Sequence, residues 1–181
     1  MKKILCVLVM VLSVSAHAER FTKASPESLK QATKQMNSLS KAITDGVEIL
    51  KSGDLVAMGA HSKRFSLLVE SGKSQFGNSV LEPLGSCFAA GNFSRTWWSA
   101  QLATAHNGGV EKIPGSIQDA LDKYQEHRDS CLQSADPVMS AKADAELKEK
   151  HGGGRECLTV FTVDKETKEV IAEPKPAHCK S

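Results

Sequence analysis

The sequence predicts a mainly α-helical domain, a bundle of four or five helices that ends in a small β-hairpin and contains two disulfides. Apolar residues recur at spacings of three and four along most of residues 25–151, the period of helices with one buried face. Three glycines at 152–154 then precede a β-branched and aromatic stretch at 157–163, which is typical of a strand. An even number of cysteines, four, follows residue 18.

Residues 1–18 have the pattern of a cleavable secretory signal peptide. Two lysines precede an apolar run that is too short to cross a bilayer, and Ala16-His17-Ala18 supplies small residues for cleavage. Cys6 lies near the start of that run, so we do not expect a lipid anchor on it. The short leader is of the bacterial kind, and we expect export to the periplasm, an oxidising compartment in which four thiols pair.

Charge argues against nucleic acid as a partner. Lys2 and Lys3 are the only charged residues among 1–18, so 23 basic and 21 acidic residues become 21 of each in the mature chain. Phosphate binding needs a basic surplus that a balanced chain lacks. No second apolar run has the length of a membrane span. We expect no cofactor and no metal, because no histidine has a ligand partner at a zinc-site spacing and no phosphate-binding loop or catalytic elbow occurs.

Two long helices are predicted first. Ser25 is a typical N-cap and Pro26 suits the first helical position, so the first helix begins there and ends near Gly53. Asp54 is a good N-cap for the second helix, whose end is blurred by glycines. The first helix carries one regular apolar stripe: Leu29, Ala32, Met36, Leu39, Ile43, Val47 and Leu50.

Three further helices are predicted before residue 152. Pro83 opens the third helix, and the Asn-Gly-Gly sequence at 107–109 stops it. Ser116 and Asp119 have the spacing of a capping box for the fourth helix. An Asp-Pro pair begins a fifth, less apolar helix over residues 136–151.

Residues 152–181 are predicted to form a disulfide-closed hairpin and tail, packed on the same domain as the bundle at 19–151. Residues 157–163 and 169–172 are the expected strands, and the polar residues between them form the turn. Prolines then end the second strand.

Four cysteines allow three pairings. We favour Cys87–Cys131 and Cys157–Cys179, because the first pair would join the third helix to the fourth and the second would close the hairpin unit. Each loop so closed is worth roughly 3–4 kcal/mol in the chain-entropy model. A catalytic cysteine is not expected, since no Cys-x-x-Cys motif occurs.

Two surfaces are candidates for partner binding. Adjacent helical side chains point about 100° apart, so we expect Trp98 in the core and Trp97 at the rim over a neighbouring loop. Alternatively, Trp97 and Arg95 form a protein-contact patch, since Trp and Arg dominate binding hot spots. The other candidate is the charged hairpin tip, a preorganised probe for a partner's cleft, with these residues: Asp164, Lys165, Glu166 and Lys168.

The architecture resembles that of small periplasmic immunity proteins, which protect bacteria against toxins of the type VI secretion kind. Residues 85–91 (GSCFAAG) are similar to the Cys-then-Gly helix start of one helical family of this class, whereas the surroundings of the second cysteine, residues 128–137, depart from its pattern. No binding residue therefore carries over. The resemblance implies an exported inhibitor that sterically blocks a cognate toxin, and it implies no oligomeric state.

Two alternatives remain open from the sequence. A periplasmic chaperone or stress adaptor would expose the apolar face of the long first helix to its clients. An uncharacterised hydrolase would have to assemble a catalytic pair from separate helices. The candidates for that pair are His61, Glu70, His106 and His127.

Overall fold

The computed structural model of the protein describes residues 20–167 and 169–180, so the predicted signal peptide at 1–18 lies outside the described residues. The chain is mainly helical with one two-stranded antiparallel sheet, and the predicted fold class is confirmed. In chain order the elements are α1 (Pro26–Ser52), α2 (Leu55–Phe76), α3 (Gly85–His106), α4 (Ser116–Ala135), α5 (Pro137–His151), the 3₁₀ turn η1 (Arg155–Cys157), β1 (Phe161–Val163) and β2 (Val170–Ala172).

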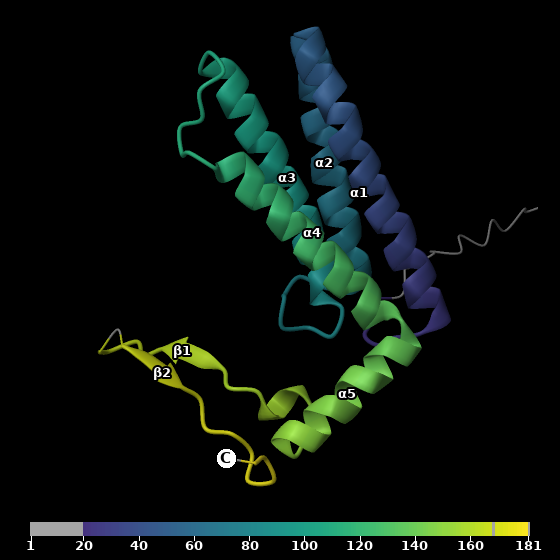
Figure 1. Cartoon of the computed structure of the whole chain (residues 1–181), viewed down its shortest axis with the longest axis vertical. Coiled ribbons are helices and arrows are strands. Elements are labelled where there is room, and N and C mark those ends of the chain that lie inside the picture. The colour runs from purple at the N-terminus through teal and green to yellow at the C-terminus, as the bar shows by residue number, and fades with distance from the viewer. Residues whose placement is uncertain (1–19, 168, 181) are drawn as a thin grey trace, which may run out of the picture.

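Helices α1 to α4 form a bundle with α3 as its central element. α3 packs against α1, α2 and α4, and its contact with α4 is the most extensive between any two described elements. Figure 1 shows these four helices grouped along the long axis of the molecule. None of the helices within residues 20–167 and 169–180 is both long and apolar enough to cross a membrane.

Local sequence signals set most helix starts. Ser25 and Ser28 form a capping box, in which each side-chain oxygen accepts a hydrogen bond from the other residue's backbone N–H. Asp54 caps α2 by accepting from two backbone N–H groups. The capping box predicted at Ser116 is wrong, because α4 begins after an N-cap glycine in the left-handed conformation and has no side-chain cap bond.

The apolar stripe of α1 faces the bundle interior. Ala32, Met36, Leu39 and Ala42 are buried, as the helical period predicts. They join two clusters of core side chains, one around the α3–α4 disulfide and one around two adjacent tryptophans of α3. Because this stripe is covered by α2, α3 and α4, it is not the open apolar face that a chaperone built on the first helix would need.

Both disulfides have the predicted pairing. Cys87–Cys131 joins α3 to α4 with 4.6 Å between the Cα atoms, and both sulfurs belong to fully buried residues. Cys157–Cys179 joins η1 to the C-terminal tail with 5.3 Å between the Cα atoms. The first disulfide therefore lies inside the bundle, and the second lies outside it.

A sharp elbow separates α4 from α5. Asp136 takes an extended conformation, and its carboxylate accepts from the first two free N–H groups of α5. Pro137 cannot donate to α4, so the helix cannot continue. The carbonyl of Ala135 instead accepts from the Ser25 backbone N–H and the Ser28 hydroxyl at the start of α1. These bonds fix the direction in which α5 leaves the bundle.

Residues 137–180 form an arm that projects from one end of the bundle. No residue of α5 is buried, and every described residue of β1 and β2 is exposed. Figure 1 shows α5 leading away from α4 and the hairpin extending beneath the bundle, on the same side as the α3–α4 connection. The strands contact each other, while η1 contacts α5, so the hairpin stands away from the helices.

Candidate functional site

The sequence prediction for the two tryptophans is wrong in one part. Trp98 is 1% exposed, as expected, but Trp97 is 3% exposed and also belongs to the core. Because α3 is central, α1 and α2 cover one of its faces and α4 covers another, so two adjacent positions are both buried. Ala120 of α4 lies in the same cluster as Trp97. Trp97 cannot form the predicted contact patch with Arg95, which is exposed and contacts Asn92 on its own helix.

Around Trp98 lies a buried polar network with a structural role. The indole N–H of Trp98 donates to Ser62 Oγ at 2.8 Å, and His61 Nε2 donates to the Ala42 carbonyl at 2.9 Å. The His61 ring packs edge-on against Trp98, with 4.7 Å between the centroids. Burial lowers the pKa of His61, so the imidazole is neutral at pH 7. This histidine joins α2 to α1 through the Ala42 carbonyl.

The four residues that a hydrolase would need do not meet. His61 is buried between α1, α2 and α3, whereas the His127 ring stacks on Phe93 at 5.1 Å. Glu70 pairs with Lys73 on its own helix, and His106 is exposed at the end of α3. No hydrogen bond or ion pair joins any two of these four described residues. They therefore form no acid–base pair.

The hairpin presents an apolar surface to solvent. Directly paired residues in β1 and β2 are Phe161 with Ala172 and Val163 with Val170, and residues two apart in a strand share a face. All four side chains therefore lie on one face of the hairpin, which we call the apolar hairpin face. Phe161 is 66% exposed, Val163 56% and Val170 69%. The opposite face carries Thr162 and Ile171.

An apolar hairpin face is normally covered by the rest of the protein. A two-stranded hairpin is marginally stable alone, and its one apolar face normally packs on a core. Large apolar patches left in solvent mark interaction sites, whereas scattered single apolar residues need no explanation. Here four apolar side chains are contiguous and project on an arm, so the apolar hairpin face is the strongest candidate for a contact surface among the described residues.

The carboxylate of Asp164 organises the turn at the charged hairpin tip. Asp164 Oδ1 accepts from the backbone N–H groups of Glu166 at 2.9 Å and Thr167 at 2.7 Å, and from the Thr167 hydroxyl. These bonds lower the pKa of the Asp164 carboxyl. Asp164 thus holds the turn, while Lys165 and Glu166 are exposed at the tip and Lys168 lies outside the described residues. Partner binding at the tip stays a prediction.

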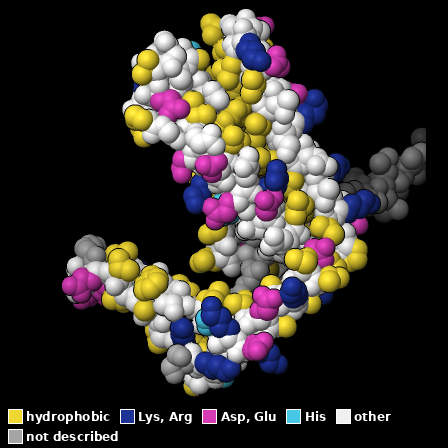
Figure 2. All heavy atoms as spheres, viewed as in Figure 1, with side chains coloured by type: hydrophobic (Ala, Val, Ile, Leu, Met, Phe, Trp, Pro, Cys, Tyr) yellow, Lys and Arg dark blue, Asp and Glu magenta, His cyan; other side chains and the backbone are white. Residues whose placement is uncertain are grey.

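Across from the hairpin lies a second apolar region on the bundle. A shallow groove between α3 and the start of α4 is lined by Phe93, Ile113 and Pro114. Ile113 is 70% exposed and Val110, in the same connection, is 63% exposed. Figure 2 shows an open hollow between the arm and the bundle, with hydrophobic side chains on both. A partner seated in this hollow could contact both surfaces at once.

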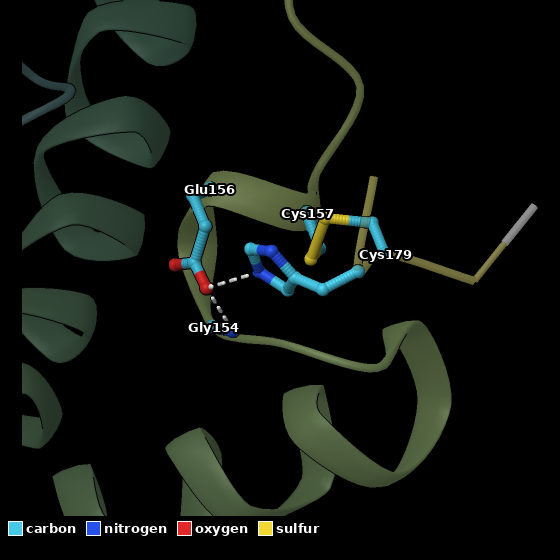
Figure 3. Close-up of a disulfide and its surroundings, with 5 residues drawn as sticks. Gly154, Glu156, Cys157 and Cys179 are labelled. Atoms are coloured by element: carbon cyan, nitrogen blue, oxygen red, sulfur yellow. Dashed lines mark hydrogen bonds and ion pairs between the residues drawn. A yellow bond between two sulfur atoms is a disulfide. The ribbon is translucent and has the colours of Figure 1, made fainter. Parts of the chain in front are cut away.

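The segment around the second disulfide, which we call the base of the arm, comprises residues 152–157 and 176–180. Glu156 Oε1 accepts from the Gly154 N–H at 2.8 Å and lies 3.5 Å from His178 Nε2. Figure 3 shows the Glu156 side chain, with its hydrogen bond to Gly154, beside the Cys157–Cys179 disulfide. The backbone N–H groups of Glu156 and Gly154 lower the pKa of the Glu156 carboxyl, and His178 adds to this effect.

Sequence reasoning identified the hairpin but missed its apolar face. The alternation of Phe161 and Val163 in β1, and of Val170 and Ala172 in β2, was a readable signal once the turn position was known. We expected the hairpin and tail to pack on the same domain as the bundle, and the elbow at Asp136 directs the hairpin away from it. The proximity of Glu156 and His178 had no sequence signal, because it depends on how the tail folds back on α5.

No protein-family model matches the chain, and no curated protein or solved structure matches it either. The resemblance to periplasmic immunity proteins therefore stays a prediction.

Proposed function

We propose that this protein is exported to the periplasm and binds another protein there, as an immunity protein that sterically blocks a cognate antibacterial toxin. The apolar hairpin face is the observation that supports binding most directly. Two disulfides and the lack of a membrane-spanning helix among the described residues are compatible with export of a water-soluble protein. The signal-peptide pattern at 1–18 supports the destination.

The proposed contact uses a hairpin that is restrained at both of its ends. The arm disulfide and the Asp164 turn limit the motion of the hairpin, so little conformational entropy is lost when it binds. Phe161 is the best anchor, because aromatic side chains dominate interface hot spots and it is 66% exposed. A toxin inserted between the arm and the bundle would have its active site covered.

Binding to the products of adjacent genes tests the proposal. The mature chain, oxidised and tagged, is mixed with each such product, and the complex is isolated and measured by titration calorimetry. We expect one product to form a stable 1:1 complex and to lose its toxicity when this protein is co-expressed in the periplasm.

Two results would contradict the proposal. If none of the adjacent gene products binds, the partner class is wrong. If the mature chain instead forms a dimer in sedimentation experiments at micromolar concentration, and that dimer buries the apolar hairpin face, the face serves self-association and the toxin has no free surface to meet.

A further inference from the structure

The hydrogen-bond pattern of the hairpin decides which backbone groups of β1 point outward. In an antiparallel pair, positions alternate between residues that exchange hydrogen bonds and residues that exchange none. The Asp164 N–H donates to the Glu169 carbonyl at 2.9 Å, and the Val160 carbonyl accepts a hydrogen bond at 2.8 Å from the chain just after β2. Phe161 and Val163 occupy the alternate positions of this register, so their N–H and C=O groups point away from β2.

We call these outward backbone groups of Phe161 and Val163 the β1 edge. Within residues 20–167 and 169–180, no hydrogen bond partners them on the side away from β2. The same two residues supply two of the four side chains of the apolar hairpin face, and both are more than half exposed. One partner segment can therefore meet free backbone groups and apolar side chains of the same residues.

The β1 edge has none of the features by which proteins normally prevent further strand pairing. Natural edge strands are blocked by charges, prolines, bulges or a covering element. Residues 157–163 (CLTVFTV) contain no charged residue and no proline. The register of β1 with β2 is continuous, so no bulge twists the strand, and every residue of β1 is exposed. Such an edge is a template for another strand.

The outer edge of β2 is blocked in two ways. Its outward positions are Val170 and Ala172, and the next position in the alternation is Pro174, which has no N–H to donate. Glu169 and Glu173 flank the strand, and their charges oppose burial against a further strand. The two edges of one hairpin therefore differ, and only that of β1 is suited to pairing.

We propose that the partner adds an extended segment to the β1 edge, as a third strand of the hairpin sheet. This segment carries apolar side chains at alternate positions, because residues two apart then continue the apolar hairpin face. A helix could cover the apolar side chains, but it would leave the backbone groups of the β1 edge without partners. The inference rests on the proposed function and names the part of the toxin that is recognised.

The position of β1 agrees with the place proposed for the partner. Figure 1 shows β1 on the side of the hairpin toward the bundle. An added strand would therefore enter the hollow between the arm and the bundle that Figure 2 shows.

Amide hydrogen exchange followed by NMR tests the inference. The isotope-labelled, oxidised mature chain is measured alone and in complex with the adjacent gene product that binds it. We expect the N–H groups of Phe161 and Val163 to exchange at least about tenfold more slowly in the complex, because they become hydrogen-bonded. The N–H groups of Val170 and Ala172, on the opposite edge, are the internal control and should keep their rates.

Two proline variants provide a second measurement. Val163→Pro removes an outward donor from the β1 edge, whereas Val170→Pro removes the directly paired outward donor from β2. Both variants lose the same apolar side chain, and neither loses a hydrogen bond within the hairpin. We expect Val163→Pro to bind the partner at least about tenfold more weakly than Val170→Pro does.

The outcomes distinguish this inference from the proposed function. If no adjacent gene product binds, both fail. Binding that slows exchange equally at the two edges, or at neither, would overturn the inference alone, and so would equal affinities of the two proline variants. Slow exchange at Phe161 in the free protein that depends on protein concentration would show that a second copy occupies the β1 edge, which also overturns it.

Discussion

At the scale of single residues, one buried network decides how closely α1 approaches α2 and α3. His61 donates to a carbonyl of α1, and Trp98 donates to Ser62 of α2, so three helices meet at these two rings. Gly46 of α1 faces them, and a Cβ atom at this position would lie 3.1 Å from His61 Nε2 and 3.2 Å from Trp98. The network accounts for the burial of Trp98, which the sequence predicted, whereas Trp97 is buried because α4 covers another face of α3.

Replacement of Gly46 by alanine should destabilise the protein by about 1–3 kcal/mol, because the added methyl group meets two packed rings that hydrogen bonds to Ala42 and Ser62 hold in place. Gly59→Ala is the matched control. Gly59 is also inside a helix, but nothing lies within 4 Å of its Cβ position, so the better helix propensity of alanine should stabilise the protein by up to about 1 kcal/mol. Chemical denaturation measures both values, and equal shifts in the two variants would contradict the packing argument.

His61 should make the free energy of unfolding depend on pH. Burial lowers the pKa of the folded-state imidazole, while the nearby Arg64 lowers it further and Asp45 raises it. As the pH falls, the unfolded state therefore takes up a proton on this histidine before the folded state does. The contribution of His61 to stability is complete above about pH 6.5 and is lost as the pH falls below that value. His61→Gln keeps a donor for Ala42 without a titrating ring.

Urea denaturation between pH 7.5 and 5 provides the measurement. The slope of unfolding free energy against pH should be smaller in His61→Gln than in the wild type, whereas His106→Gln, an exposed histidine, should leave it unchanged. Identical slopes in all three proteins would show that His61 is not the titrating group.

At the scale of elements, helix caps and turn residues determined what the sequence could predict. Ser25, Asp54 and Asp136 each cap the helix that the sequence assigns to them. A short polar side chain just before a helix can accept hydrogen bonds from the free N–H groups of the first turn, so this signal is local and readable. The start of α4 was mispredicted. The Ser116 backbone N–H donates to Glu111, and the N-cap residue is Gly115, which has no side chain to cap the helix. The cysteine pairing followed from which elements each bond would join.

The two disulfides should stabilise different parts of the molecule. Cys87 and Cys131 are 44 residues apart in sequence and buried in the bundle, so the double alanine variant should lose about 4 kcal/mol of bundle stability. The double serine variant at Cys157 and Cys179 should leave the bundle melting temperature unchanged, because the arm contributes no residue to the bundle clusters. Its effect should be faster amide exchange across residues 160–173.

Differential scanning calorimetry and hydrogen exchange separate these results. A similar fall in melting temperature in both double variants would show that the arm and the bundle unfold as one unit, contrary to the separation seen in the contacts between elements.

At the scale of the whole molecule, the arm and the bundle have different origins of stability and different roles. Regular apolar periodicity predicted the bundle, because each stripe had a partner helix to cover it. The direction of the arm was not predictable, since it depends on two hydrogen bonds between residues more than 100 positions apart and on the break at Pro137. That direction leaves the apolar hairpin face in solvent and places it across a hollow from the α3–α4 connection (Figure 2).

In the candidate site, too, features that depend on neighbouring residues were predicted and features that depend on distant residues were not. The tip residues Asp164 to Glu166 were predicted because turn chemistry is local, and Asp164 does hold the turn. Trp97 was wrongly placed at the rim, because burial on two sides of α3 depends on helices far away in sequence. The face formed by Phe161 and its neighbours became visible only with the strand register.

The central claim is that the apolar hairpin face binds a protein partner. The most direct measurement compares three forms of the mature chain by titration calorimetry with the adjacent gene product that forms the complex: wild type, Phe161→Ser with Val170→Ser, and Ile171→Ser. Ile171 lies on the opposite face of the same hairpin, so its replacement controls for effects on hairpin folding. The double variant should bind at least about tenfold more weakly, because it loses a hot-spot aromatic and its neighbour, while Ile171→Ser should bind like the wild type. Equal affinity of the double variant and the wild type would contradict the claim.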